Sequence, residues 1–239
     1  LIILSTCLGL IILGLISAMV HLGNPRNAPY AVSNITHSWL SREIVTINLF
    51  AVSIVLLWIV TFADVQKGLF LIETVSLILG ILTILTMSRV YRLKVVPVWN
   101  SIATPMDFFG TALLAGSVAS AVLNWVISDK VYSPCLTFLI FSGFGLCLKI
   151  ASIVTTISIQ DSSKTLFWYA SQRNKFKGQT LAHVFRAGLY TTGVAIFAAA
   201  NIGLTDQPII FLLISFCIIA FTEIWNRFCF YDSFARLGL

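Results

Sequence analysis

Seven apolar runs, each about as long as a membrane span, dominate this 239-residue chain. They lie near residues 1–21, 44–63, 68–90, 105–128, 134–158, 181–203 and 207–230. A helix needs about 20 predominantly apolar residues to cross a bilayer, and in lipid it satisfies its own backbone hydrogen bonds. The sequence therefore predicts an all-α polytopic membrane protein with about seven transmembrane helices, forming a single helical-bundle domain over residues 1–239.

The composition excludes a water-soluble globular domain. Hydrophobic residues make up 58% of the chain and charged residues 10%, and the mean hydropathy is +0.96. Leu1 already lies inside an apolar run, without a methionine or a basic flank before it. We therefore expect a further N-terminal segment in the full protein, carrying an eighth helix. A cleaved signal peptide is the rival interpretation, but no basic n-region or small-residue cleavage site is present.

The connections between the runs alternate in length, which predicts two different faces. Side A has the long connections, at residues 22–43, 91–104 and 159–180, and the tail after Tyr231, whereas side B has the short links 64–67, 129–133 and 204–207. The long connections carry Trp39, Trp99 and Trp168. Long loops with exposed aromatic residues are typical of a docking surface, so we predict that soluble partners bind side A.

Basic residues also collect on side A. They are Arg26, Arg42, Arg89, Arg92, Lys94, Lys164, Arg173, Lys175, Lys177, Arg227 and Arg236, against only Lys67 and Lys130 on side B. The positive-inside rule would make side A cytoplasmic. A soluble partner with an acidic face, exported across the membrane, would account for the same pattern. Both compartments stay open for side A.

Two charged residues lie deep within the spans. At 1.5 Å per residue, Lys149 and Glu223 are both roughly 22 Å from side B. Ionisable residues in a span cost roughly 2.5 to 3.5 kcal/mol each, and a pair lowers that cost because each charge neutralises the other. We predict that Lys149 and Glu223 form an intramembrane pair. Glu73, nearer side B, is predicted to be a buried, protonated hydrogen-bond donor.

The other ionisable residues of the spans gather in the half next to side A. They are His21, Glu43, Arg89, Asp107, His183, Arg186 and Arg227. A transporter would place its charges near the midplane, beside broken helices. A polar cluster near one surface fits a lipid-soluble substrate that exchanges protons with one aqueous phase.

Several motifs recur in an order that resembles the membrane-anchor subunits of the dimethyl sulfoxide reductase family. The motifs are His21-Leu-Gly-x-Pro25, Ser41-x-Glu43-Ile44, Arg89-Val-Tyr91, Val96-Pro97-x-Trp99, Thr104-Pro-Met-x-Phe-Phe109, Glu223-x-x-x-Arg227 and Phe230-Tyr231. They extend from the first loop to the last helix. Arg26 follows Pro25 directly, whereas the family arginine stands two residues after the loop proline.

The resemblance implies a function and a set of partners. Such anchors lie in the prokaryotic cytoplasmic membrane, bind and oxidise menaquinol or ubiquinol, and pass electrons to a four-cluster iron–sulfur subunit, which feeds a molybdopterin catalytic subunit. It further implies no haem and no metal in this chain, and no nucleic-acid partner. The five cysteines agree with this, because they lie in apolar runs without a C-x-x-C spacing, and an iron–sulfur cluster needs about four thiolates.

Residue chemistry assigns roles within such a site. A neutral imidazole accepts a hydrogen bond and titrates near neutrality, so we predict that His21 accepts a quinol proton and that Glu43 relays it. Arg26, Arg89, Arg186 and Arg227 are predicted to bind a quinone oxygen or to stabilise its negative charge, and Tyr91 and Trp99 to line the ring pocket. The structural alternatives are a helix-end cap for His21, snorkelling for the arginines and an interfacial belt for the aromatic residues.

Three other classes remain as alternatives. A polysulfide-reductase-type anchor would also handle quinol without haem. A b-haem anchor needs paired histidines on facing helices, and the chain has only His21, His37 and His183. A transporter or a pure scaffold would lack the quinol site altogether.

Overall fold

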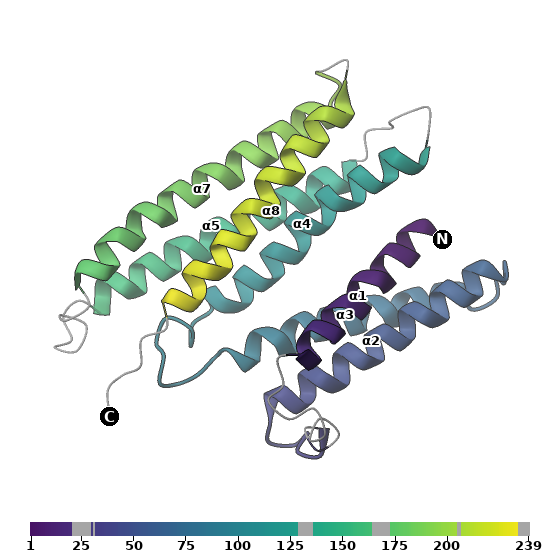
Figure 1. The fold of residues 1–239 in the computed structure, drawn as a ribbon, viewed down its shortest axis with the longest axis horizontal. Helices are drawn as coiled ribbons and strands as arrows, with labels where there is room; N and C mark the ends of the chain where they lie inside the picture. Colours follow the sequence, from purple (N-terminus) through teal and green to yellow (C-terminus); the bar gives the residue numbers. More distant parts are fainter. Residues whose placement is uncertain (21–29, 31, 129–135, 164–172, 205–206, 234–239) are drawn as a thin grey trace. The chain divides into compact units, whose positions relative to one another are not determined.

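The computed structural model describes residues 1–20, 30, 32–128, 136–163, 173–204 and 207–233, and the regular secondary structure of these residues is helical (Figure 1). The helices are α1 (Ile2–Val20), α2 (Trp39–Phe62), α3 (Leu69–Val90), α4 (Ala103–Ser128), α5 (Leu136–Ser163), α7 (Arg173–Asn201) and α8 (Pro208–Asp232). Six of them, α2 to α8, are long and apolar enough to cross a membrane, and α1 is an apolar helix whose described stretch, Ile2–Ala18, is slightly shorter. The prediction of an all-α polytopic membrane protein is confirmed.

The helices continue further into side A than the apolar runs do. α2 begins at Trp39, so Glu43 lies in its second turn rather than at its start. Ser38 caps this helix, accepting a hydrogen bond from Ser41 N at 3.2 Å. The predicted connection 159–180 is also shorter, because α5 extends to Ser163 and α7 begins at Arg173. A helix can continue beyond the lipid into water, so hydropathy alone makes the helices too short at their side A ends.

Residues 1–90 form one compact unit, here called unit 1. Its helices α2 and α3 are an antiparallel hairpin joined by a tight turn, in which Asp64 (φ 52°) and Gly68 (φ 83°) adopt the left-handed backbone conformation. Gln66 steadies the turn by donating from Nε2 to Asp64 Oδ1 at 3.0 Å. α1 is held to α2 by a hydrogen bond from Trp58 Nε1 to Ser5 Oγ at 2.9 Å.

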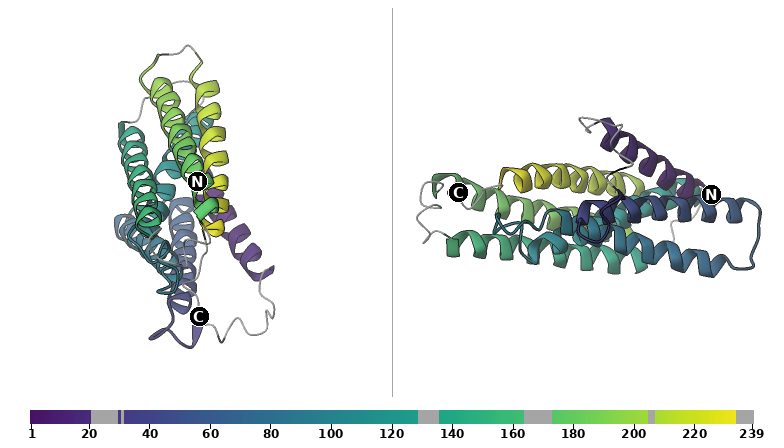
Figure 2. Two further views of the ribbon diagram at one scale, coloured as in Figure 1. Left: turned by 90° about the vertical axis from the view of Figure 1, so that its left-hand side faces the viewer. Right: turned by 90° about the horizontal axis from the view of Figure 1, so that it is seen from below.

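Residues 91–239 form the second compact unit, unit 2, whose helices run side by side (Figure 2). α4 packs on α5, α5 on α7, α7 on α8 and α8 on α4, so the four helices close into an antiparallel bundle. The approach of α4 to α5 depends on glycine: a Cβ on Gly145 would lie 2.7 Å from the backbone nitrogen of Leu114. Small residues at a helix crossing allow this close backbone contact in membranes.

Large apolar side chains are exposed on the outside of the helices, whereas many polar and charged side chains are buried, the reverse of a water-soluble protein. Large apolar side chains point outward, as at Phe70 (80% exposed) and Leu181 (74%), which suits contact with lipid. The buried set of unit 2 includes Lys149, Asn201 and Arg186 beside the apolar core residues Leu114, Phe197 and Leu212. The interior of this unit is therefore where charged chemistry is concentrated.

Candidate functional site

The side A end of the α2–α3 hairpin brings two charged side chains to the same level. Thr46 Oγ1 of α2 and Thr86 Oγ1 of α3 are hydrogen-bonded at 2.9 Å. Glu43 lies one turn before Thr46 and Arg89 lies one turn after Thr86, so in antiparallel helices both follow the threonine contact toward side A. Both side chains are half-buried. Within the described part of the protein, neither side chain takes part in a hydrogen bond or an ion pair.

An aromatic ring lies beside these two charges. The Arg42 guanidinium carbon is 4.3 Å from the centroid of the Trp39 ring, and that of Arg89 is 5.6 Å away, both within cation–π range. Arg42 is fixed by donating to the carbonyl oxygens of Ile35 at 2.8 Å and Thr36 at 2.6 Å. Among the described residues, Arg89 contacts the Trp39 ring and donates to no acceptor, so its N–H donors are suited to bind a ligand.

An open apolar groove runs along α2 from this level. It has a volume of about 280 Å³ and is lined by Val32, Ile44, Val45, Asn48, Leu49 and Val52. Such a surface accepts an apolar ring or chain. Predicted site residues His21 and Arg26 lie outside the described residues, so the assignments that involve them stay predictions.

Unit 2 holds a different arrangement, a buried ion network centred on Lys149. Lys149 Nζ lies 2.9 Å from Asp107 Oδ1, 2.9 Å from Glu223 Oε2 and 2.6 Å from Thr111 Oγ1. The pairing of Lys149 with Glu223, predicted from their depth, is therefore present, and Asp107 joins it as a second carboxylate. Lys149 is fully buried, so both carboxylates are needed close to it in a low-dielectric interior.

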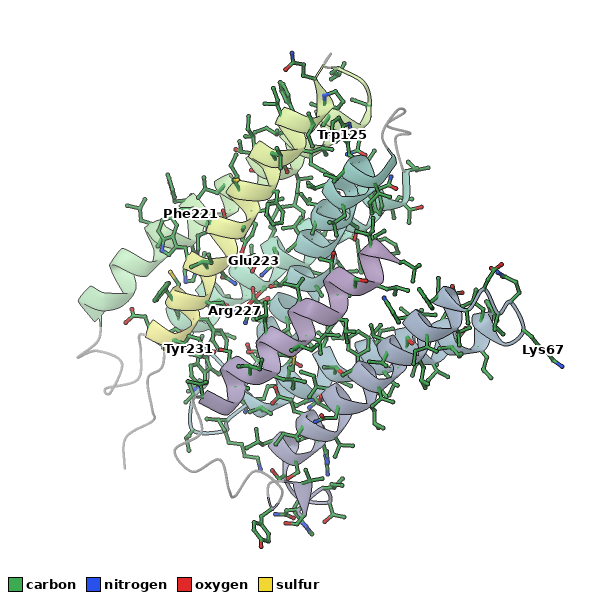
Figure 3. All side chains as sticks on the ribbon, turned by 45° about the vertical axis from the view of Figure 1, so that its right-hand side comes forward. Lys67, Trp125, Phe221, Glu223, Arg227 and Tyr231 are labelled. Carbon is green, nitrogen blue, oxygen red and sulfur yellow. The ribbon has the colours of Figure 1, made fainter. Side chains whose placement is uncertain are left out.

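The network continues toward side A through α8 and α7. Asn226 Nδ2 donates to both carboxylate oxygens of Asp107, at 2.9 and 3.1 Å, and Asn226 Oδ1 accepts a hydrogen bond from Arg186. Arg186 is also hydrogen-bonded to Nδ1 of His183. Arg227, one turn beyond Glu223 along α8 (Figure 3), lies over the Phe108 ring at 4.1 Å and 3.7 Å from Asp107 Oδ2. Arg186 and Arg227 are thus held by protein groups, and their quinone role stays a prediction.

A small cavity of about 40 Å³ adjoins this network on its side A flank. Its lining is mixed, with the polar residues Thr104, Asp107, Ser152, Thr156, His183, Arg186, Asn226 and Ser233 beside Val98, Ala103, Ile153, Cys229 and Phe230. It lies inside the four-helix bundle, below the connection that precedes α4.

Tyr91 and Trp99, the predicted ring-pocket residues, pack in an aromatic cluster with α8. Trp99 stacks on Phe230 at 4.8 Å between centroids, and its Nε1 donates to Phe230 O and Ser233 Oγ, both at 3.1 Å. The Tyr91 hydroxyl lies 3.0 Å from that of Tyr231. The cluster fixes the connection 91–102 to the end of α8, and it lies one layer behind the cavity, which Phe230 and Ser233 line.

Comparison with known proteins identifies the family of this chain. The model of the DMSO reductase anchor subunit family (DmsC) matches residues 2–232, almost the whole sequence. The chain belongs to this family. It is therefore a membrane anchor subunit of a DMSO reductase-type complex, a multi-pass protein of the bacterial inner membrane that associates with the catalytic and iron–sulfur subunits.

Two relatives of this anchor subunit come from Escherichia coli (strain K12). The YnfH subunit of an anaerobic dimethyl sulfoxide reductase is 26% identical over 242 residues, covering 95% of this protein and 79% of the relative. The C subunit of anaerobic dimethyl sulfoxide reductase is 33% identical over 116 residues, covering 46% of this protein and 40% of the relative. No solved structure matches the sequence significantly.

The structure adds network residues of the anchor subunit that the sequence reasoning missed. Thr111 follows Asp107 by four residues and Asn226 follows Glu223 by three, so each shares a helix face with a carboxylate, a spacing that would have revealed both. The prediction for Glu73 is wrong: this carboxylate is exposed on the outside of α3. Among the residues that the structure describes, no three metal-ligating side chains come together.

Proposed function

We propose that this anchor subunit binds menaquinol or ubiquinol at the side A end of α2 and α3 and oxidises it. The electrons pass to a four-cluster iron–sulfur subunit docked on side A, which feeds a molybdopterin catalytic subunit. The proposal rests on Glu43 and Arg89, two half-buried residues of opposite charge at the same level of the α2–α3 hairpin. Neither side chain has a hydrogen-bond or ion-pair partner among the described residues. Charges of opposite sign without partners among the described residues are suited to a ligand that gives up a hydroxyl proton and is left with negative charge on an oxygen.

The chemistry follows from the stoichiometry of quinol oxidation. Each quinol loses two electrons and two protons and becomes a quinone, so its hydroxyl groups need acceptors on the protein. His21, by the family resemblance, accepts the first proton, and Glu43 relays protons to the water at side A. Arg89 stabilises negative charge on the ring oxygen while electrons leave, and the Trp39 ring restrains the guanidinium. The groove along α2 receives the apolar part of the quinol.

Substitution of the acceptor tests the proposal. Glu43→Gln keeps the size of the side chain but removes its capacity to take a proton, so quinol oxidation by the whole assembled complex should fall by roughly 10² to 10⁴. The rate is measured with a reduced quinol analogue in membranes, with complex abundance determined in parallel. His21→Gln should give a loss of the same order.

Glu73→Gln is the matched control, because it removes a carboxylate from a span of the same unit at an exposed position. It should leave the rate unchanged. Equal rates for Glu43→Gln, Glu73→Gln and the unmodified complex would show that the α2–α3 end is not the proton-accepting site.

A further inference from the structure

The small cavity of unit 2 contains buried polar atoms that no protein group satisfies. His183 Nε2 and Arg186 Nε have no hydrogen-bond partner among the described residues, and both residues line the cavity. The residues themselves are 94% and 98% buried, from exposures of 6% and 2%. Buried polar atoms are almost always hydrogen-bonded, to protein or to ordered water, so these two atoms require a partner within the cavity.

The chemistry of the lining identifies that partner. Arg186 Nε–H is a donor, the carboxylate oxygens of Asp107 are acceptors, and the hydroxyls of Ser152 and Thr156 serve as either. An anion would be repelled by Asp107 and a cation by Arg186, whereas water both donates and accepts. The cavity of about 40 Å³ has room for roughly three or four waters at about 10 to 15 Å³ each.

We propose that this cavity is a water site, and that its waters join the His183 imidazole to the Asp107 carboxylate and let the buried ion network exchange protons with side A. The direct protein route between these residues runs through Arg186 and Asn226, neither of which gives up a proton readily. A chain of waters in the cavity connects His183 to Asp107 without passing through either of these residues. The step moves a proton only: an O–H bond of a cavity water breaks as one forms on Asp107, and that water takes a proton in turn from the next water toward side A. Arg186 donates to Nδ1 of His183, so His183 keeps its own proton on Nε2 and holds the waters by donating a hydrogen bond to them.

The surroundings of the cavity are compatible with a movable proton. The titratable or charged groups that face the network are Asp107 from α4, Lys149 from α5, His183, Arg186 and Tyr190 from α7, and Glu223, Arg227 and Cys229 from α8. Val98 and Ser233, from the side A connection and the end of α8, line the cavity at its side A end. The exchange role during turnover rests on the proposed quinol oxidation, whereas the presence of the waters does not.

Two neighbouring threonines on α5 allow the presence of the waters to be tested separately from their role in proton exchange. Thr156 lines the cavity, whereas Thr155 does not and donates to its own helix at Ala151 O, 2.8 Å away. Thr156→Leu should fill the cavity with apolar volume, and Thr155→Leu is the matched control. High-resolution electron cryomicroscopy of the whole complex should show ordered density between His183 and Asp107 in the unmodified protein and in the control, and none in Thr156→Leu. A dry cavity in the unmodified protein, at a resolution where other buried waters are visible, overturns the water site.

The exchange role is tested on the same variants by turnover. Thr156→Leu should lower quinol oxidation about tenfold or more, while binding of a quinol-site inhibitor stays unchanged. His183→Leu should behave like Thr156→Leu, and His183→Gln, which keeps a donor and an acceptor, should retain both the waters and most of the rate. Lost waters with an unchanged rate overturn the exchange role. If the proposed quinol oxidation site is wrong, the His21 and Glu43 variants will oxidise quinol at an unchanged rate. That result has no bearing on whether ordered waters are seen between His183 and Asp107.

Discussion

The two units treat their charges in opposite ways. In unit 2, Lys149 is shared by Asp107 and Glu223 and is buried among groups that complete its hydrogen bonds. In unit 1, Glu43 and Arg89 lie one turn from a threonine contact, and neither is paired with another described residue. A buried charge that is paired with opposite charges and fully hydrogen-bonded contributes to helix packing. A charge that lacks such partners within the protein can interact with a ligand. The difference separates charges that are compensated by protein groups, in unit 2, from charges that are suited to bind a ligand directly, in unit 1.

The largest expected effect is removal of the central cation of unit 2. Lys149→Met removes the cation that Asp107 and Glu223 share. Arg227 stays 3.7 Å from Asp107 Oδ2, but Glu223 loses its ion pair in a buried site, which costs about 3 to 5 kcal/mol. The variant should accumulate poorly, as measured by its abundance in membranes and by thermal unfolding of the complex. Adding Asp107→Asn and Glu223→Gln removes the stranded charges and should restore most of the abundance. A stable single variant would show that the network contributes little to the fold.

A smaller loss is expected where α4 meets α5. Gly145→Ala places a Cβ 2.7 Å from the backbone nitrogen of Leu114, so the helices must separate, at a cost of about 1 to 3 kcal/mol. Gly80→Ala in unit 1 is the comparison, because its Cβ would meet only the ring edge of Phe50 at 3.3 Å, and a side chain can shift. Thermal unfolding should show a clear decrease for the first and little for the second. Equal decreases would contradict a tighter packing of unit 2.

The threonine contact between α2 and α3 should contribute less again. Thr46→Val removes the hydrogen bond to Thr86 and should lower stability by about 0.6 kcal/mol, the average for such bonds between membrane helices. Thr74→Val, at a residue that donates only to Phe70 O of its own helix, is the control. The difference between the two unfolding midpoints measures the bond. If Thr46→Val also alters quinol turnover, the contact positions Glu43 as well.

The smallest effect on stability is expected for the acceptor itself. Glu43→Gln should change the free energy of unfolding by less than about 0.5 kcal/mol, because no described protein group depends on the carboxylate. Thermal unfolding of the complex provides the check, beside the activity measurement proposed above. A large destabilisation would place Glu43 with the structural charges of unit 2 and remove the contrast between the units.

The spans and the depth of the charges were predictable from the sequence, because lipid requires long apolar helices and tolerates few ions. Lys149 and Glu223 were paired by counting residues from side B, a step that needs no coordinates. It was harder to predict which face of each helix points into the bundle, because lipid and the protein interior are both apolar and hydropathy does not distinguish them. Asn226 and Thr111 carry no charge, so their depth in the span did not single them out as it did Lys149 and Glu223. The cluster of Trp99 with Phe230 joins residues 131 positions apart, which no local pattern indicates.

The arrangement of the ion network also bears on how the protein enters the membrane. Asp107 and Lys149 belong to the consecutive helices α4 and α5, so this hairpin brings one negative and one positive charge to the buried network before any later helix arrives. α8 brings Glu223 and Arg227 four residues apart, opposite charges within a single helix. The α4–α5 hairpin and α8 therefore each bring charges of both signs to the insertion machinery, whereas α7 brings Arg186 without an acidic residue of its own. The ion pairs of Lys149 in the finished bundle are thus assembled from segments whose charged residues are opposed by a charge of the other sign within the same segment.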